Sequence, residues 1–170
     1  MLNTRLIVSI VLPIIVGAVL LTVFFKEEDK STEAPLFTIT DIDGAVFKLS
    51  EHRGKVVVIE FMATWCRYCK AQIEELKLVN EHFTDSSTVI VSISVDPSDN
   101  SEALVKYRDE LEATWIFAQG YKVGLNYGVK ALPTTVIIDH EGKMRFRHEG
   151  VVEASKLEAE ISQILNELKG

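Results

Sequence analysis

Cysteine is nearly absent from this sequence. Its 170 residues contain two, Cys66 and Cys69, with only Arg67 and Tyr68 between them. A disulfide that closes so short a loop removes little freedom from the unfolded chain, so a purely structural staple is disfavoured. A structural zinc site takes about four protein ligands, and no second cysteine pair is present. The histidines are scattered singly, at His52, His82, His140 and His148. We therefore expect neither a bound metal nor a cofactor.

An excess of positive charge is also missing. The chain carries 18 Lys and Arg against 25 Asp and Glu, and the basic residues form no stripe with interleaved aromatic side chains. Proteins that bind nucleic acid cluster Lys and Arg against phosphates, so a nucleic-acid partner is not expected. Internal repeats and low-complexity tracts are absent too, and the length suits one ordinary domain with an appendage.

Residues 6–25 lack charge altogether, and their sequence is LIVSIVLPIIVGAVLLTVFF. A helix of this length spans about 30 Å, the thickness of the hydrocarbon core of a bilayer. A cleaved signal peptide is the alternative, but its apolar region is usually about 7–15 residues long and ends in a small-residue cleavage site. This run is longer and ends in Val23, Phe24, Phe25 and Lys26, which favours an uncleaved transmembrane anchor.

The anchor divides the chain into residues 1–5, the anchor itself, a charged linker over residues 26–33 and a folded domain over residues 34–170. Arg5 precedes the anchor, whereas the linker carries no net positive excess. By the positive-inside rule, the N-terminus then lies in the cytoplasm and the folded domain outside it. We expect a single-pass protein of the cell membrane whose extracytoplasmic domain meets conditions that permit disulfides.

Apolar periodicity predicts an α/β fold for the domain. Residues 56–61 are apolar at nearly every position, which is typical of a central strand covered on both faces. A helix with Ile73, Leu76 and Val79 on its apolar side follows. Strand–helix–strand crossovers imply parallel pairing and a later hairpin adds an antiparallel edge, so the pattern predicts a sandwich with a mixed central sheet. The predicted strands are residues 36–42, 45–49, 56–61, 88–95, 115–118, 134–138 and 144–147, and the predicted later helices are residues 102–111, 122–127 and 153–168.

The two cysteines fall where the central strand passes into its helix. The N-terminus of a helix favours an anion, so we expect the pKa of the Cys66 thiol to be lowered. Cys69 lies three residues further along the same helix face, within disulfide reach of Cys66. One sulfur is then presented to partners and the other lies behind it. This arrangement suits attack on a disulfide followed by release through the second thiol.

Three stretches resemble the thioredoxin superfamily. VVVIEFMATWCRYCK, residues 56–70, resembles its active-site strand and helix start, and GVKALPTTVIIDHEGKM, residues 128–144, resembles its other half. APLFTITDIDGAVFKLSEHRGK, residues 34–55, is similar to the N-terminal β-hairpin of the TlpA/ResA-like branch. The resemblance implies a thioredoxin-like three-layer sandwich preceded by a transmembrane helix. It also implies a membrane-anchored thiol-disulfide oxidoreductase that acts on disulfide-containing proteins and takes electrons from a membrane donor.

The resemblance assigns roles to individual residues. Cys66 matches the nucleophilic cysteine and Cys69 the resolving cysteine, while Trp65 matches the tryptophan that flanks the site. Pro133 matches the cis-proline of the superfamily, although a cis X–Pro bond is found at only about 5–6% of such bonds in general. Its expected use is to leave the backbone of Leu132 open for pairing with an extended substrate segment.

Glu60 interrupts the apolar strand six residues before Cys66. A buried carboxyl group is costly to ionise, so its pKa should rise. Thioredoxins carry an acidic residue at this place that is implicated in proton transfer with the buried cysteine, and we favour this role over a side chain that escapes to solvent. Arg67 adds positive charge beside Cys66, which should stabilise the thiolate, and Tyr68 offers an aromatic contact to partners.

The sequence departs from the TlpA/ResA-like branch at Gln72 and Glu74, where that branch often has a glutamate and a proline. A peroxidase of the related redoxin kind is disfavoured, because Cys66 lacks the Pro-x-x-x-Thr-x-x-Cys context. The favoured function is reduction of protein disulfides, for which cytochrome maturation and disulfide repair are both uses of this scaffold. A disulfide-forming oxidant and a redox-inactive binding or chaperone module stay open as alternatives.

Overall fold

The computed structural model describes residues 32–84 and 87–168. The predicted anchor, residues 6–25, lies outside these ranges, as does most of the predicted linker. Within the ranges that are described, no helix is both long and apolar enough to cross a membrane.

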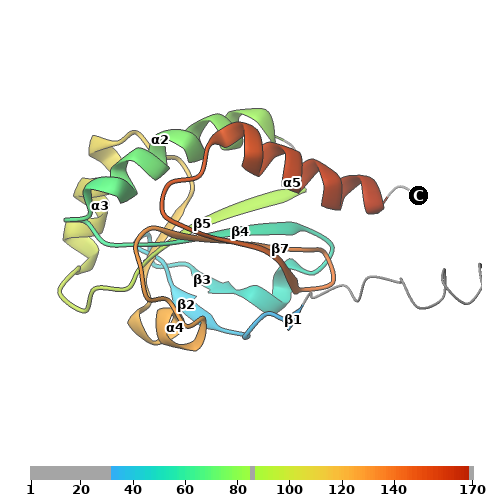
Figure 1. Cartoon of the computed structure of the whole chain (residues 1–170). Helices are drawn as coiled ribbons and strands as arrows, with labels where there is room; N and C mark the ends of the chain where they lie inside the picture. The colour runs from blue at the N-terminus through green and yellow to red at the C-terminus, as the bar shows by residue number, and fades with distance from the viewer. Residues whose placement is uncertain (1–31, 85–86, 169–170) are drawn as a thin grey trace, which may run out of the picture. The chain divides into compact units, whose positions relative to one another are not determined.

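A six-stranded mixed sheet forms the centre of the domain, in the order β1-β8-β7-β4-β5-β6 (Figure 1). Strands β4, β5 and β6 are parallel, and β7 runs antiparallel to β4. Every residue of β4 is buried, as its continuous apolar run predicts. The strands are β1 (Thr32–Glu33), β4 (Val56–Met62), β5 (Thr88–Ser94), β6 (Ile116–Gln119), β7 (Thr134–Ile138) and β8 (Lys143–Glu149).

The predicted late hairpin, β7 and β8, supplies the antiparallel side of the sheet, but β7 is an interior strand rather than an edge. All five residues of β7 are buried, whereas β8 is only partly covered. Beyond β8 the sheet continues to β1, where Thr32 pairs with Met144 and Glu33 with Lys143. These two residues were predicted to belong to the linker. Their pairing covers the edge of the sheet only at the first two residues of β8.

Helices cover both faces of this sheet (Figure 1). Side chains of α2, α3 and α5 form one apolar cluster with the sheet, and α4 forms a second cluster with the N-terminal hairpin. The predicted α/β sandwich is therefore confirmed, and the ends of the three later helices each differ from the predicted ones by one residue, as helix ends commonly do. The helices are α2 (Arg67–His82), α3 (Ser101–Glu110), α4 (Tyr121–Asn126) and α5 (Ala154–Glu167).

The N-terminal hairpin is a separate two-stranded sheet of β2 (Thr38–Thr40) and β3 (Val46–Lys48). Its strands are shorter than the predicted ones. On one side the Asp41 side chain accepts hydrogen bonds from the backbone N–H groups of Asp43 and Ala45, at 3.0 and 2.8 Å, which begins the turn early. On the other side a 3₁₀ turn, Leu49–His52, follows β3 directly.

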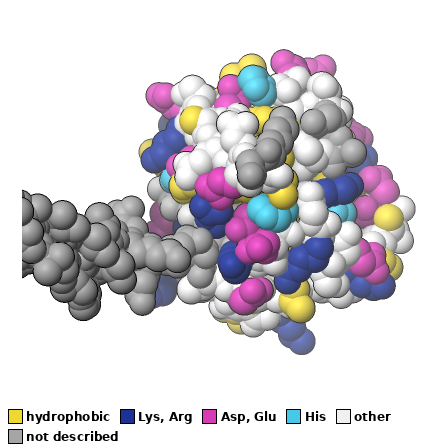
Figure 2. All heavy atoms as spheres, turned by 90° about the vertical axis from the view of Figure 1, so that its right-hand side faces the viewer, with side chains coloured by type: hydrophobic (Ala, Val, Ile, Leu, Met, Phe, Trp, Pro, Cys, Tyr) yellow, Lys and Arg dark blue, Asp and Glu magenta, His cyan; other side chains and the backbone are white. Residues whose placement is uncertain are grey.

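Charged side chains of both signs are interspersed on the face of the domain drawn in Figure 2. Among the pairs that the structure contains are Arg145 with Glu167 and Lys143 with Glu141, each at 2.7 Å. Such a surface is typical of a solvated domain with no single-sign patch on that face.

Candidate active site

Cys66 and Cys69 form a disulfide at the N-terminus of α2, with Cα atoms 5.2 Å apart. Cys66 is the N-cap residue, and its Sγ accepts a hydrogen bond of 3.1 Å from the backbone N–H of Cys69. Cys66 keeps 5% of its surface exposed, whereas Cys69 keeps none. The predicted placement at the helix N-terminus is confirmed, and Cys66 is slightly exposed whereas Cys69 is fully buried. The lowered pKa of the Cys66 thiol stays a prediction.

Exposed aromatic side chains flank the disulfide. Trp65 is 70% exposed and Tyr68 is 67% exposed, and Arg67 between the cysteines is exposed as well. The indole N–H of Trp65 donates a 2.6 Å hydrogen bond to Asp96, whose pKa is lowered by hydrogen bonds from Ser98 and from this indole. Trp65 is thus held in one orientation although most of its surface faces solvent. Large exposed aromatic groups beside a reactive sulfur are suited to contact with a partner protein.

The loop between β5 and α3 fixes the chain that leads into Cys66. The buried carboxylate of Asp99 accepts hydrogen bonds from the backbone N–H of Thr64 at 2.9 Å, from the Thr64 hydroxyl at 2.6 Å and from the Ser94 hydroxyl at 2.6 Å. This role was not predicted from the sequence. Short polar residues in this loop indicate helix caps, and Asn100 is indeed the cap of α3. Nothing local indicates that Asp99 reaches a segment 35 residues earlier.

The peptide bond between Leu132 and Pro133 is cis, which confirms the prediction. Pro133 directly precedes β7, and Thr134 pairs with Phe61 of β4, so Pro133 lies at the end of the sheet where β4 leads toward the cysteines. The Pro133 carbonyl accepts a 2.8 Å hydrogen bond from the Gly150 N–H, and Leu132 is half-buried between the two apolar clusters. Pairing of Leu132 with a substrate segment stays a prediction.

Glu60 is fully buried in β4. The Ser92 hydroxyl donates a 2.7 Å hydrogen bond to Glu60 Oε2, whereas Glu60 Oε1 is buried without a partner among the described residues. Burial raises the pKa of Glu60 to about 8, and the Ser92 hydrogen bond opposes part of that rise. The predicted burial is confirmed, and escape of the side chain to solvent is ruled out. A carboxyl group with this pKa can both accept and donate a proton near neutral pH.

Gln72 is one of the two positions at which the sequence departs from the pattern of the TlpA/ResA-like branch that it resembles. Its side chain is buried in α2 and makes two hydrogen bonds with the backbone of Val152: it accepts from the N–H at 2.8 Å and donates to the carbonyl at 3.2 Å. The neighbouring Glu75 accepts from the N–H of Ala154 at 2.8 Å. Gln72 therefore ties α2 to the chain between β8 and α5.

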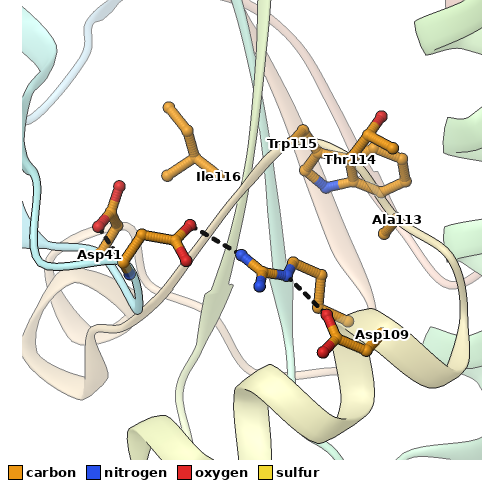
Figure 3. Close-up of a pocket in the computed structure, with 8 residues that line it drawn as sticks. Asp41, Asp109, Ala113, Thr114, Trp115 and Ile116 are labelled. Atoms are coloured by element: carbon orange, nitrogen blue, oxygen red, sulfur yellow. Dashed lines mark hydrogen bonds and ion pairs between the residues drawn. The ribbon is translucent and has the colours of Figure 1, made fainter.

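A polar pocket of about 410 Å³ lies apart from the disulfide, between α3, β6 and the hairpin turn (Figure 3). Arg108 spans it through ion pairs with Asp43 at 2.7 Å and Asp109 at 3.2 Å. None of the predicted site residues lines this pocket. In the part of the chain that the structure describes, no three His, Cys, Asp or Glu residues are grouped so that they could hold a metal ion.

A mixed sheet flanked by helices, a Cys-x-x-Cys disulfide at a helix N-terminus and a cis-proline at the same end of the sheet together define a thioredoxin-like redox domain. The chain belongs to the AhpC/TSA family, whose model matches residues 31–147.

The chain is similar to several known proteins. It is 27% identical over 163 residues to the thiol-disulfide oxidoreductase ResA of Bacillus cereus, covering 94% of each chain. It is 26% identical over 131 residues to the thioredoxin-like protein YneN of Bacillus subtilis, covering 76% of each. Among solved structures, a putative thiol:disulfide interchange protein DsbE from Chlorobium tepidum superposes with a TM-score of 0.72 at 30% identity, covering 81% of this chain and 98% of that chain.

Proposed function

We propose that this protein is a membrane-anchored, extracytoplasmic thiol-disulfide oxidoreductase that reduces disulfides in other proteins. The observation that carries the proposal is the Cys66–Cys69 disulfide at the N-terminus of α2, with Cys66 slightly exposed and Cys69 fully buried. Relatives named as thiol-disulfide oxidoreductases along 94% of the chain support the enzyme class.

The reaction begins from the reduced pair. The Cys66 thiolate attacks one sulfur of the substrate disulfide, which breaks that bond and releases one substrate thiolate. The Cys69 thiol then gives up its proton, and its sulfur attacks Cys66 Sγ, so that the mixed disulfide breaks and the second substrate thiolate leaves. Two electrons pass from the cysteine pair to the substrate. A dithiol donor in the membrane returns the pair to its reduced state.

Glu60 serves as the proton acceptor for Cys69 in this scheme. It lies on the sheet face covered by α2, because its neighbours two residues away in β4, Val58 and Met62, belong to the same apolar cluster as both cysteines. With a pKa of about 8, it takes the proton when the Cys69 thiol becomes a nucleophile and returns it when the Cys69 thiolate leaves during reduction of the disulfide. A Glu60→Gln variant should slow both half-reactions.

Substrate contact is assigned to the exposed rim around Cys66. Trp65 and Tyr68, both exposed and close to Cys66 in the chain, offer apolar surface to a substrate, and Arg67 stabilises the attacking thiolate by its charge. Leu132 and Pro133 lie at the same end of the sheet, where an extended substrate segment can pair with the backbone.

Insulin reduction by the purified protein, with dithiothreitol as the donor, tests the activity. We expect turnover by the wild type and none by Cys66→Ser. A double variant, Cys66→Ser with Cys69→Ser, that keeps full function in cells would favour the binding-module alternative instead. The direction of electron flow is tested by the reduction potential of the pair: a value well above that of the compartment would favour the oxidant.

The anchor and the orientation are supported by the uncharged run at residues 6–25 and by its flanking charges. A reporter enzyme that is active only outside the cytoplasm, fused to the C-terminus, should be active. A reporter that requires the cytoplasm should be inactive at the same position, and the reverse result would overturn the proposed topology.

A further inference from the structure

Glu60 lies in a buried polar row that crosses three strands. In the sheet register it pairs with Ser92 of β5 on one side and with Thr135 of β7 on the other, so the three side chains share one face. Ser92 and Thr135 are both fully buried. The two neighbours differ in one respect: the Ser92 hydroxyl is bonded to Glu60, whereas the Thr135 hydroxyl is buried without a partner among the described residues.

A second hydrogen bond fixes the direction of the first. The indole N–H of Trp115 lies 2.9 Å from Ser92 Oγ, and an indole N–H can only donate. Ser92 Oγ therefore accepts from Trp115 and is left with one hydrogen of its own. Within the described chain that hydroxyl has one acceptor, Glu60 Oε2 at 2.7 Å, so the hydrogen points to the carboxyl group.

This direction distinguishes the two oxygens of Glu60. Oε2 is an acceptor whether the carboxyl group is charged or neutral, because the Ser92 hydroxyl occupies it. The proton of the neutral acid is then carried by Oε1, the oxygen without a partner in the described residues. A donated hydrogen bond also favours the charged carboxylate, which keeps the acid from becoming too weak to release its proton.

Two further polar groups lie in the cluster that covers this face of the sheet, the Tyr107 hydroxyl and the Cys69 sulfur. Tyr107 of α3 is buried, and both Glu60 and Asp99 help to raise the pKa of its phenol, after burial itself. The Tyr107 hydroxyl has no partner among the described residues. Cys69 of α2 belongs to the same apolar cluster as Tyr107. None of these groups is bonded to Ser92.

We propose that Trp115 and Ser92 are positioning residues for the proton step: Trp115 orients the Ser92 hydroxyl onto Glu60 Oε2, and this leaves Oε1 as the oxygen that exchanges a proton with Cys69. The proposal rests on the proton-acceptor role given to Glu60 in the proposed function. Trp115, which is 9% exposed, stands at the outer end of this hydrogen-bond chain and lines the pocket in Figure 3.

The test measures the pKa of Glu60 in the oxidised full chain. The titration is monitored by the infrared band of the Glu60 carboxyl group, which is identified by its loss in Glu60→Gln. Ser92→Ala should raise the pKa by about one unit, because a hydrogen bond to the charged form is lost. Trp115→Phe should raise it by less, since the Ser92 hydroxyl is then free to turn away. Ser92→Thr keeps the hydroxyl and should restore the wild-type value.

A double variant sharpens the test. Because Trp115 acts only through Ser92, Ser92→Ala combined with Trp115→Phe should match Ser92→Ala alone, within about 0.3 pKa unit. Thr135→Val is the matched control: it removes the hydroxyl on the other side of Glu60 and should leave the pKa unchanged. Additive effects of the two substitutions, an unchanged pKa in Trp115→Phe, or an equal rise in Thr135→Val would each overturn the proposal.

Kinetics separate this failure from failure of the proposed function. The pH profile of the step in which Cys69 resolves a mixed disulfide should move upward with the pKa of Glu60 in Ser92→Ala. If Glu60→Gln keeps the wild-type pH profile of this step, the acceptor role of Glu60 is wrong, and so is the proposed proton exchange with Cys69. If Glu60→Gln slows the step but the Ser92 and Trp115 variants do not shift the pKa, the acceptor role stands and the positioning role is wrong.

Discussion

Replacement of Glu60 by Gln should change how the stability of this protein depends on pH. The side chain is fully buried and its pKa is raised by burial to about 8, against an ordinary value of 4.5. Below pH 4.5 Glu60 is protonated in both the folded and the unfolded chain, so its titration takes nothing from the free energy of unfolding. As pH rises from 4.5 to about 8, the unfolded chain releases the proton while the folded chain retains it, so stability falls.

The magnitude follows from these two values. In that window the unfolded state binds one proton fewer than the folded state, and stability falls by about 1.4 kcal/mol for each pH unit. The whole window corresponds to about 5 kcal/mol. Between about pH 5.5 and pH 7.5 the loss is about 3 kcal/mol, a large share of the 5–15 kcal/mol that is typical of a folded domain. Glu60→Gln has nearly the same shape and does not titrate.

Guanidinium unfolding of the oxidised protein in a mild detergent, at several pH values, measures this effect. Between about pH 5.5 and pH 7.5, the free energy of unfolding of the wild type should fall by about 3 kcal/mol relative to that of Glu60→Gln. His52, whose pKa is lowered by burial, titrates in both proteins and cancels in the difference. Glu81→Gln, exposed on α2, should follow the wild type within about 0.5 kcal/mol. Parallel profiles for wild type and Glu60→Gln would refute the reasoning.

Three further predictions concern the site and its supports. Cys69→Ser should accumulate mixed disulfides with partner proteins through Cys66, visible on non-reducing gels, and Cys66→Ser should accumulate none; equal trapping by both contradicts the assigned roles. Asp99→Ala should lower the free energy of unfolding by about 3 kcal/mol, since one buried and two part-buried donors lose their acceptor, whereas the exposed Asp109→Ala should cost under about 0.5 kcal/mol; equal losses in denaturant unfolding would count against the anchoring role. Gln72→Leu should cost about 2 kcal/mol in the same assay because two hydrogen bonds to the chain after β8 are lost, and an unchanged midpoint would show that they add nothing.

Local patterns were sufficient for most elements of the fold. The continuous apolar run at residues 56–61 predicts a strand buried on both faces, and β4 is buried throughout. The predicted strand at residues 134–138 has the bounds of β7. Its interior place was not predictable, because which strands become neighbours depends on packing of the whole sheet. The same holds for β1, whose two polar residues carry no strand pattern of their own.

The candidate site, like the fold, was predictable in those features that depend on local sequence. Spacing alone places Cys66 and Cys69 one turn apart at a helix start, and an acidic residue inside an apolar strand indicates that Glu60 is buried. The cis peptide bond before Pro133 was predicted from the resemblance to thioredoxins. None of these features required knowledge of which segments lie side by side in the folded chain.

What the sequence by itself determined, then, is the redox pair, its helix, the buried acid and the order of strands and helices, since each depends on residues close together in the chain. Only the tertiary structure decided how these parts are held and tuned. Asp99 reaches Thr64 across 35 residues, Ser92 reaches Glu60 across 32, and Gln72 reaches Val152 across 80. Hydrogen bonds of this kind are set by strand register and helix packing; a shift of one residue in β5, for example, would turn Ser92 to the other face of the sheet, away from Glu60.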